Sequence, residues 1–438
     1  MKKKVVSLLI AAAMVTGLLA GCGGKDSSAT DSKGADGEVK IQFMHQQVEQ
    51  ERQDMIQAII DKFEEENPGI KVEQIPVNED DFDTKIVALG GSGTLPAIIE
   101  YNQEQAKKSV TNQFTDLEAT DEVINNKGAD AFYEGALELM KTEDGEHYSA
   151  VPIASWVQGI WVNEKMLQEK GFEAPENWDE VLEIAEAFYD PGSKQYGIAL
   201  PTGDVAFTEQ VFSQYAISNG ANVFDKDGGI TFDTPEMKEA VEFYKSLASY
   251  SMPGSTEVAD VKDAFVGGNA PMAMYSTYII NAVIEAGFID DLSLVLPTNK
   301  DEAAYGCVLA LGISDGLEDA ETEAAKKFVS YMLEDEGNIG WLHMAPGGLQ
   351  PVVEAISGNE AYESLDAIQK YAHLSDDIAE AVENLQLFGT VDGKNFVAMG
   401  DIESAGIISK ALNNIIVQGA DIDSELSSAQ SAIEDIVK

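Results

Sequence analysis

The sequence predicts an α/β protein made of two lobes, or at most three. Short apolar strands alternate with amphipathic helices, which is typical of a parallel sheet whose strands are joined by crossover helices. The chain has 438 residues, more than one ordinary domain holds. Its hydrophobic content of 44% is enough to fill more than one core.

The clearest elements come directly after residue 38. Residues 39–44 alternate between apolar and polar side chains, as a half-buried strand does. In residues 51–66 the apolar side chains recur at helical spacing and form one stripe, and the Asn-Pro-Gly that follows ends the helix. The alternation continues with a strand at 70–75, a helix at 81–89 that stops at a GGSG sequence, and a strand at 96–101.

The rest of the chain repeats this theme. Thr234 has the residue type of a helix N-cap, and Pro235 suits the first helical position after it. Other predicted elements are strands at 151–153, 159–162 and 196–200, a tight turn at 225–229, helices opening at Asn177 and Phe207, and a helical region from about residue 401.

The start of the chain has the pattern of an exported protein. Lys2, Lys3 and Lys4 precede an apolar segment over 5–20. This segment is as long as the core of a signal peptide and short for a membrane span. We therefore expect residues 1–21 to be a signal peptide.

Residues 19–22, Leu-Ala-Gly-Cys, resemble the lipobox of bacterial lipoproteins. The resemblance implies cleavage before Cys22, whose thiol would carry lipid with acyl chains such as palmitate and hold the protein on the membrane. The Gly- and Ser-rich residues 22–38 then form a flexible tether. The expected location is the extracellular face of the cell membrane of a Gram-positive-like bacterium. The alternative is an uncleaved membrane helix with an incidental cysteine.

The charge excludes whole classes of partner. The formal net charge is −49, and Arg52 is the only arginine. Nucleic acids and other polyanions would be repelled, and no basic patch is present to bind them. A solvated acidic surface explains the charge and is compatible with a neutral ligand.

The sequence shows no metal-binding or phosphate-binding motif. The four histidines stand far apart, and no glycine-rich phosphate loop is present. Cys307 has no disulfide partner once Cys22 is lipidated, and it lies in an apolar run that suggests a small buried side chain. We expect no catalytic residue, no cofactor and no metal.

Aromatic rings and amides follow several predicted strands. Ligands of open α/β sheets bind beyond the carboxyl ends of strands. Rings that stack on the apolar face of a sugar, with amides and carboxylates that bind its hydroxyls, suit a carbohydrate. Taken alone, each ring could equally pack in the core. The candidates from this pattern are Gln46, Gln47, Tyr101, Asn102, Glu104, Trp156, Tyr275, Tyr278 and Trp341.

Five segments in a fixed order carry a family resemblance. They are FEEENPGIKVE (63–73), GSGTLPAII (91–99), the stretch from DGEHYSAVPIASW to NWDEVLEIA (144–185), FVGGNAPMAMYSTY (265–278) and AAKKFVSYMLEDEG (324–337). Behind a lipobox, this order resembles the family 1 extracellular solute-binding proteins of ABC importers, the maltose-binding-protein-like group. Ala97 departs from the family, which usually has aspartate there.

The resemblance implies a two-lobed periplasmic-binding-protein-like fold of type II, with a ligand cleft between lobes joined by a hinge. It implies an N-terminal lobe of 39–158 plus 302–345 and a C-terminal lobe of 159–301 plus 346–438. Trp156 would stand near the hinge. By family position, the cleft residues would be Gln46, Gln47, Tyr101, Asn102 and Glu104 from the first lobe and Glu209, Phe212, Tyr275 and Tyr278 from the second.

The implied function is capture of a sugar or oligosaccharide by lobe closure, followed by delivery to the permease of an ABC importer. The chain would act as a monomer and would perform no chemistry. Two alternatives stay open: a binding protein for a non-sugar solute such as a peptide or polyamine, and a surface glycoside hydrolase.

Overall fold

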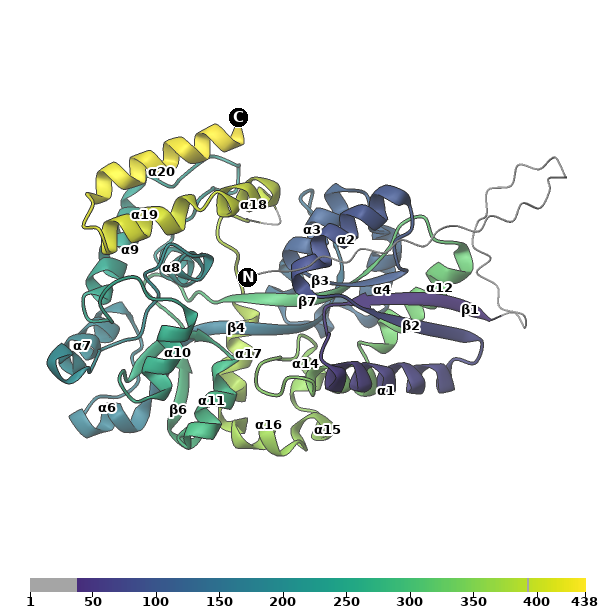
Figure 1. The fold of residues 1–438 in the computed structure, drawn as a ribbon, viewed down its shortest axis with the longest axis horizontal. Helices are drawn as coiled ribbons and strands as arrows, with labels where there is room; N and C mark the ends of the chain where they lie inside the picture. Colours follow the sequence, from purple (N-terminus) through teal and green to yellow (C-terminus); the bar gives the residue numbers. More distant parts are fainter. Residues whose placement is uncertain (1–37, 392–393) are drawn as a thin grey trace, which may run out of the picture.

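The computed structural model describes residues 38–391 and 394–438. The predicted signal peptide, Cys22 and nearly all of the predicted tether lie outside these residues. Two groups of elements lie along the long axis of the molecule and are joined by strands β4 (Val151–Asn163) and β7 (Tyr305–Ile313) (Figure 1). In the part of the chain that the structure describes, no helix is long and apolar enough to cross a membrane.

One sheet of seven strands runs through the described residues, in the order β2-β1-β3-β7-β4-β5, with β6 also paired to β4. The strands of the first group, β1, β2 and β3, are parallel, as the predicted crossover helix between β1 and β2 requires. β7 is antiparallel to both β3 and β4. The sheet is therefore continuous from one group of elements to the other.

The first group confirms the predicted alternation of strands and helices. The apolar stripe of α1 is buried through Ile56, Ile59, Ile60 and Phe63. The elements are β1 (Val39–His45), α1 (Gln50–Glu66), β2 (Ile70–Pro76), α2 (Glu79–Ser92), β3 (Ile98–Asn102), α3 (Gln103–Thr111), α4 (Leu117–Lys127), η1 (Ala129–Ala131), α5 (Glu134–Glu138), α12 (Asp319–Tyr331) and α13 (Asp335–Leu342).

Helix α2 runs past its predicted end and includes the first glycines of the GGSG sequence. A Cβ on Gly90 would lie 2.2 Å from Cζ of Phe114, so the glycine lets that ring pack against the helix. The helix stops at Ser92 because Gly93 has φ +67°, a left-handed conformation that favours glycine.

Strand β4 is one strand where the sequence predicted two. It pairs with β7 over Val151–Gln158 and with β5 over Gln158–Val162. All its side chains are buried except Trp156, which is partly exposed. A strand covered on both faces shows no alternation, and this hid its continuity in the sequence.

The second group is mostly helical. Asn177 and Thr234 accept hydrogen bonds from backbone N–H groups of α7 and α9 and cap these helices. The elements are α6 (Glu164–Lys170), α7 (Trp178–Phe188), η2 (Pro191–Ser193), α8 (Ala206–Ser218), α9 (Pro235–Ala248), α10 (Val258–Val266), β5 (Met272–Ser276), α11 (Ile279–Ala286), η3 (Ile289–Asp291), β6 (Leu292–Val295), α18 (Phe396–Ser404), α19 (Ile407–Ile416) and α20 (Ile422–Val437).

The predicted strand at 196–200 is absent, and this prediction was wrong. Only Ala199 makes a bridge, to Ala273 of β5. The next residue, Leu200, donates its N–H to Oγ of Ser251 instead of to a neighbouring strand, so the ladder does not extend.

Buried side chains form two hydrophobic clusters. The first surrounds β1, β3, β7 and the start of β4 and reaches α10 and α11. The second lies among α7, α8, α9, α19 and α20. Residues 349–387 contribute to the first cluster and residues from Phe388 onward to the second. The lobe boundaries stay a prediction. The segment that leads to the change of cluster holds α14 (Glu354–Ser357), α15 (Glu360–Glu363), α16 (Asp366–Lys370), η4 (Ala372–Leu374) and α17 (Ser375–Glu383).

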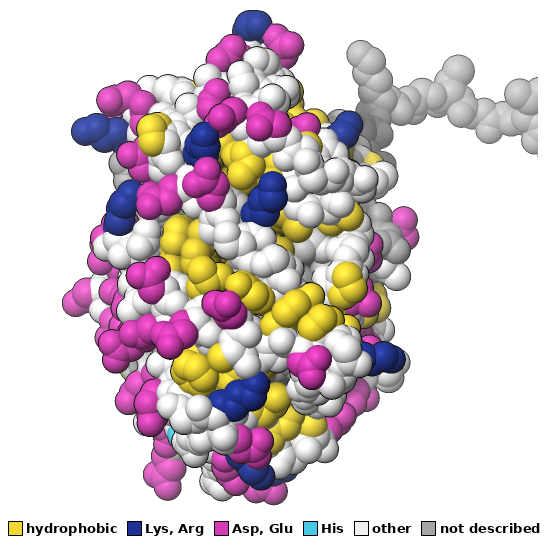
Figure 2. Space-filling model, turned by 90° about the vertical axis from the view of Figure 1, so that its left-hand side faces the viewer, with side chains coloured by type: hydrophobic (Ala, Val, Ile, Leu, Met, Phe, Trp, Pro, Cys, Tyr) yellow, Lys and Arg dark blue, Asp and Glu magenta, His cyan; other side chains and the backbone are white. Residues whose placement is uncertain are grey.

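The acidic composition appears on the surface. On the face drawn in Figure 2, Asp and Glu side chains are spread more widely than Lys and Arg, and apolar patches lie between them.

Candidate ligand-binding site

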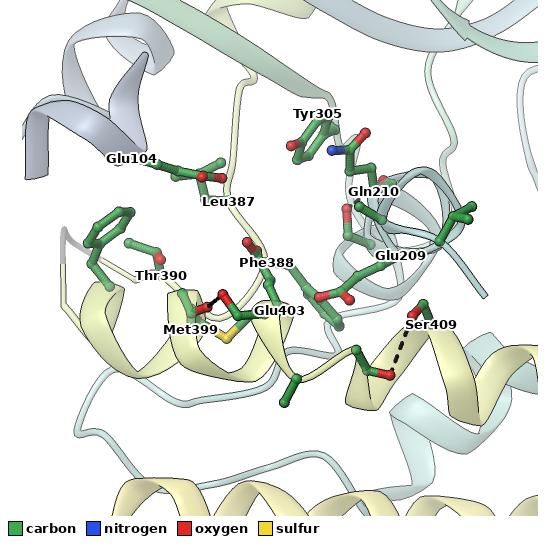
Figure 3. A pocket seen from close by; sticks show the side chains of 18 of the residues that line it. Glu104, Glu209, Gln210, Tyr305, Leu387, Phe388, Thr390, Met399, Glu403 and Ser409 are labelled. Atoms are coloured by element: carbon green, nitrogen blue, oxygen red, sulfur yellow. Dashed lines mark hydrogen bonds between the residues drawn. The ribbon is translucent and has the colours of Figure 1, made fainter. Parts of the chain in front are cut away.

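A cavity of about 350 Å³ lies where elements of both groups meet. This volume falls within the range of small-molecule sites. Its walls come from α3, α8, β7, α18 and the segments before and after α18 (Figure 3). The lining residues are Glu104, Lys108, Asp204, Val205, Ala206, Glu209, Gln210, Ser213, Tyr305, Leu387, Phe388, Thr390, Phe396, Met399, Gly400, Glu403, Ser404, Ala405, Gly406 and Ser409.

Helix α3 brings Glu104 to this cavity. Asn102 caps the helix: its side-chain oxygen accepts the N–H of Gln105 at 2.7 Å, and its own N–H donates to Oε1 of Gln105 at 3.1 Å. This capping box fixes the first turn, which contains Glu104. Asn102, a predicted ligand contact, is therefore engaged in holding the helix and does not line the cavity.

Helix α8 carries the most buried carboxyl of the cavity. Glu209 is 5% exposed, and its Oε1 has no hydrogen-bond partner among the described residues. Burial raises the pKa of Glu209 to about 8, and the nearby carboxyls of Glu403 and Glu104 contribute to the rise. An unpartnered carboxyl oxygen is a group that a ligand can satisfy.

Glu403 of α18 faces the same space from another wall. Water reaches its side chain, but the surrounding wall removes part of its hydration and raises its pKa to about 7, with a further contribution from Glu104. The Lys108 ammonium acts in the opposite direction on both Glu403 and Glu104. The carboxyls of Glu104, Glu209 and Glu403 thus form one electrostatically coupled set.

Aromatic rings complete the walls. Tyr305, at the start of β7, is partly exposed toward the cavity, and Phe388 and Phe396 line it from the C-terminal segment. The Trp156 ring lies 5.9 Å from the Tyr305 ring, so the two form one aromatic unit at the point where β4 and β7 pair. Nζ of Lys107 lies 5.2 Å from the centroid of Phe396, a cation–π contact between α3 and α18.

Two predicted contacts, Gln46 and Gln47, gather around a different carboxyl. Glu100 is buried and accepts the backbone N–H of Gln46 at 2.7 Å and the side-chain amide of Gln47 at 2.9 Å. Burial raises the pKa of Glu100 to about 7. Arg52 donates to Oε1 of Gln47 at 2.7 Å. These side chains form a network beside the first strands and are not among those that line the cavity.

The tyrosines of β5 and its exit lie outside the cavity wall. Tyr275 is half-buried and meets the Phe207 ring edge-on, with centroids 6.0 Å apart. Tyr278 is 43% exposed, and its ring covers Gly348, where a Cβ would lie 2.6 Å from the ring. An exposed ring of this kind remains accessible to a ligand larger than the cavity.

Three predicted contacts lie in the hydrophobic cores. Tyr101 is 2% exposed and its hydroxyl bonds that of Ser109 at 3.2 Å. Phe212 and Trp341 are fully buried against Tyr244 and Phe43, respectively. Each side chain points from its helix or strand into apolar neighbours, so we do not retain it in the proposed contact set.

Several lining residues were missed. Glu403, Phe388 and Phe396 come from the C-terminal segment. Asp204 comes from the loop before α8, and Gln210 comes from α8 itself. The C-terminal lining residues follow no predicted strand, so a position after a strand end, which pointed to Glu104, did not point to them. Cys307, expected to be buried, is partly exposed on β7, and loss of hydration there raises the pKa of its thiol well above the ordinary value.

Comparisons with known proteins identify the family. The sequence model of the bacterial extracellular solute-binding proteins, a family of binding proteins and not of enzymes, matches residues 49–339. The putative ABC transporter periplasmic-binding protein YcjN of Escherichia coli (strain K12) is 42% identical over 437 residues, which cover 100% of this chain and 99% of that protein.

Solved structures show the same fold at low identity. Maltose-bound MalE3 of T. maritima has a TM-score of 0.70 at 18% identity, over 91% of this chain and 99% of that one. The cyclic alpha-maltosyl-1,6-maltose binding protein of Arthrobacter globiformis has a TM-score of 0.75 at 18% identity, over 92% of this chain and 100% of that one. The chain therefore belongs to the bacterial extracellular solute-binding proteins of ABC transporters and has their two-lobed, maltose-binding-protein-like fold.

Proposed function

We propose that this protein captures a sugar or oligosaccharide and delivers it to the membrane permease of an ABC importer. The observation that carries the proposal is the cavity between the two groups of elements, where the rings of Tyr305, Phe388 and Phe396 stand beside carboxyl and amide groups. Rings cover the apolar face of a sugar, and Gln210 with the glutamates supplies partners for its hydroxyls. Two solved proteins of the same fold have a bound sugar: MalE3 of T. maritima has maltose, and a cyclo/maltodextrin-binding protein has maltotetraose.

Capture would involve domain closure. The cavity is built from α3 of the first group and α8 and α18 of the second, so a ligand inside it contacts both. A ligand that contacts both lobes favours the closed arrangement by its extra contacts. A thermal-shift screen of mono- and oligosaccharides against peptides tests the proposal, since a bound ligand raises the melting temperature. Stabilisation by peptides alone would overturn it.

Replacing Trp156 by alanine is expected to weaken sugar binding by roughly 1–3 kcal/mol, the scale of losing one buried ring contact. Trp156 is not among the lining residues, but its ring packs against Tyr305 at the cavity wall, so its loss leaves the tyrosine ring without this support. Titration calorimetry with the most stabilising sugar of the screen measures the change. Trp156→Phe keeps a ring and should retain most of the affinity. Unchanged affinity in Trp156→Ala would remove this ring from the site.

We further propose that Cys22 carries the lipid that holds the protein on the outer face of the cell membrane. Cys22→Ser is then expected to release the mature protein into the culture medium, because the single attachment point is lost. Cell fractionation and immunoblotting measure the distribution. Cys307→Ser, which changes the other cysteine, should leave the protein on the membrane. Retention of the Cys22→Ser protein on membranes would contradict the lipid anchor.

A further inference from the structure

The cavity holds more negative groups than positive ones. Glu104, Glu209, Glu403 and Asp204 line it, and Lys108 is the only lysine, arginine or histidine among its lining residues. Asp204 accepts a hydrogen bond from the Ser409 hydroxyl at 2.8 Å and is thereby partly satisfied. The three glutamates come from α3, α8 and α18, and they approach one space from different sides (Figure 3). These three glutamates are far apart in the sequence, and only the fold brings them together.

Glu209 gives the strongest indication of a missing partner. Its side chain lines the cavity although the residue is only 5% exposed. Its Oε1 has no hydrogen-bond partner among the described residues. Lys108 acts on Glu104 and Glu403 but is not among the charges that affect Glu209. Among the described residues, Oε1 of this buried carboxyl therefore lacks a hydrogen-bond donor, and no positive charge offsets the rise in the pKa of Glu209.

We propose that the captured ligand carries an ammonium group, which binds between the carboxylates of Glu209, Glu403 and Glu104. This inference rests on the proposed function, because it treats the cavity as the capture site. An amino sugar or amino-bearing oligosaccharide is the ligand class that combines this group with the hydroxyls expected by the ring-and-amide walls.

An ammonium fits this site better than a hydroxyl does. A hydroxyl can donate one hydrogen bond to the Glu209 carboxylate but leaves the repulsion among the three carboxylates in place. An ammonium donates up to three hydrogen bonds and also compensates that repulsion. The Tyr305 ring beside the glutamates adds a face on which a cation is favoured.

The electrostatics also fix the sign of the pH dependence. The groups that face this position are Glu104 and Lys108 from α3, Glu209 from α8, Asp204 from the loop before it, Tyr305 from β7 and Glu403 from α18. Protons compete with the ammonium for carboxyls whose pKa values are raised, to about 8 for Glu209 and about 7 for Glu403. Ammonium binding is therefore expected to release protons and to strengthen with rising pH over the range in which the ligand amine keeps its own proton. A neutral sugar that accepts hydrogen bonds from protonated carboxyls would show the opposite trend.

Matched ligand pairs test the proposal on the full mature chain. Glucosamine is compared with glucose, galactosamine with galactose, and β-1,4-linked glucosamine oligosaccharides with cello-oligosaccharides of equal length. Within each pair one ammonium replaces one hydroxyl per sugar unit. Spermidine is included as a cation without a sugar. Melting temperatures at pH 6, 7 and 8 identify the binders, and calorimetry in two buffers of different ionisation enthalpy measures proton release.

Two glutamine variants and one control connect the effect to the site. Glu209→Gln and Glu403→Gln remove one carboxylate each while keeping the side-chain shape. Each is expected to lower the affinity for the tightest-binding amine ligand by about ten- to a hundredfold, the scale of a lost hydrogen bond between charged groups. Glu65→Gln, on the exposed face of α1, makes the same change of net charge and should leave affinity unchanged.

The outcomes separate this inference from the sugar proposal. Tighter binding of the amine member of a pair, lost in Glu209→Gln, supports the inference. Equal or tighter binding of the hydroxyl member overturns it and leaves sugar capture standing. Binding of spermidine without any sugar keeps the ammonium site and overturns the sugar proposal. If no amine raises the melting temperature, the ammonium site is overturned.

Discussion

Glu209→Gln is expected to stabilise the ligand-free protein strongly at pH 8.5 and to leave its stability almost unchanged at pH 4. The pKa of Glu209 is raised from 4.5 to about 8 in the folded state. Between these values the unfolded chain ionises while the folded chain keeps its proton, so the wild type loses about 1.4 kcal/mol of stability per pH unit. The full loss above pH 8 is about 3–5 kcal/mol. Below pH 4 both states are protonated and the loss vanishes.

Urea denaturation of the wild type and the variant at pH 4, 6 and 8.5 measures this difference. Glutamine cannot ionise, so the free-energy gap between the two proteins should widen with pH. Glu65→Gln is the control for the change in net charge, because its exposed side chain faces water in both states. A gap that stays constant across the three pH values would show that the Glu209 carboxyl is ionised in the folded protein and would contradict the burial argument.

The sequence predicted the fold well where local pattern and tertiary structure agree. The strands and helix over 39–76 were visible because β1 and β2 lie at one side of the sheet and α1 buries one stripe only. Trp161 and Trp178, which were not among the candidate ligand contacts, are 0% and 5% exposed and lie in the core. Patterns failed where both faces of an element are covered, as in β4, and where one bridge replaces a ladder, as at Ala199.

The site was predictable only in part, for a related reason. Glu104 was found because it follows the end of a strand, and Glu209 was found by family position; both line the cavity. Glu403 and Phe396 lie on a helix near the C-terminus, and nothing in their local pattern distinguishes them from a solvated helix face. Tyr101 and Trp341 have residue types that suit either a core or a binding site, and only the packing around them shows that they are in the core.

Trp161→Ala is expected to destabilise the protein by about 3–5 kcal/mol, the range for removing a large aromatic side chain from a core. Trp161 is fully buried near the C-terminal end of β4, opposite Ala273 of β5 and Leu294 of β6. Its Nε1–H donates to the carbonyl of Tyr275 at 2.8 Å, and alanine would leave that carbonyl without this donor. Urea denaturation at pH 6 measures the loss.

Trp161→Phe separates packing from hydrogen bonding. Phenylalanine keeps a ring in the core but cannot donate to Tyr275, so it should cost about 1–3 kcal/mol, the penalty for an unsatisfied buried acceptor with a smaller packing defect. Because β4 pairs with β5 of the second group and with β7, which in turn pairs with β3 of the first group, the larger loss in Trp161→Ala should lower the unfolding midpoint of the whole protein in a single step. Two separated transitions, or a loss below about 1 kcal/mol, would mean that the two groups unfold independently of this strand. The β4 connection would then not be what couples them.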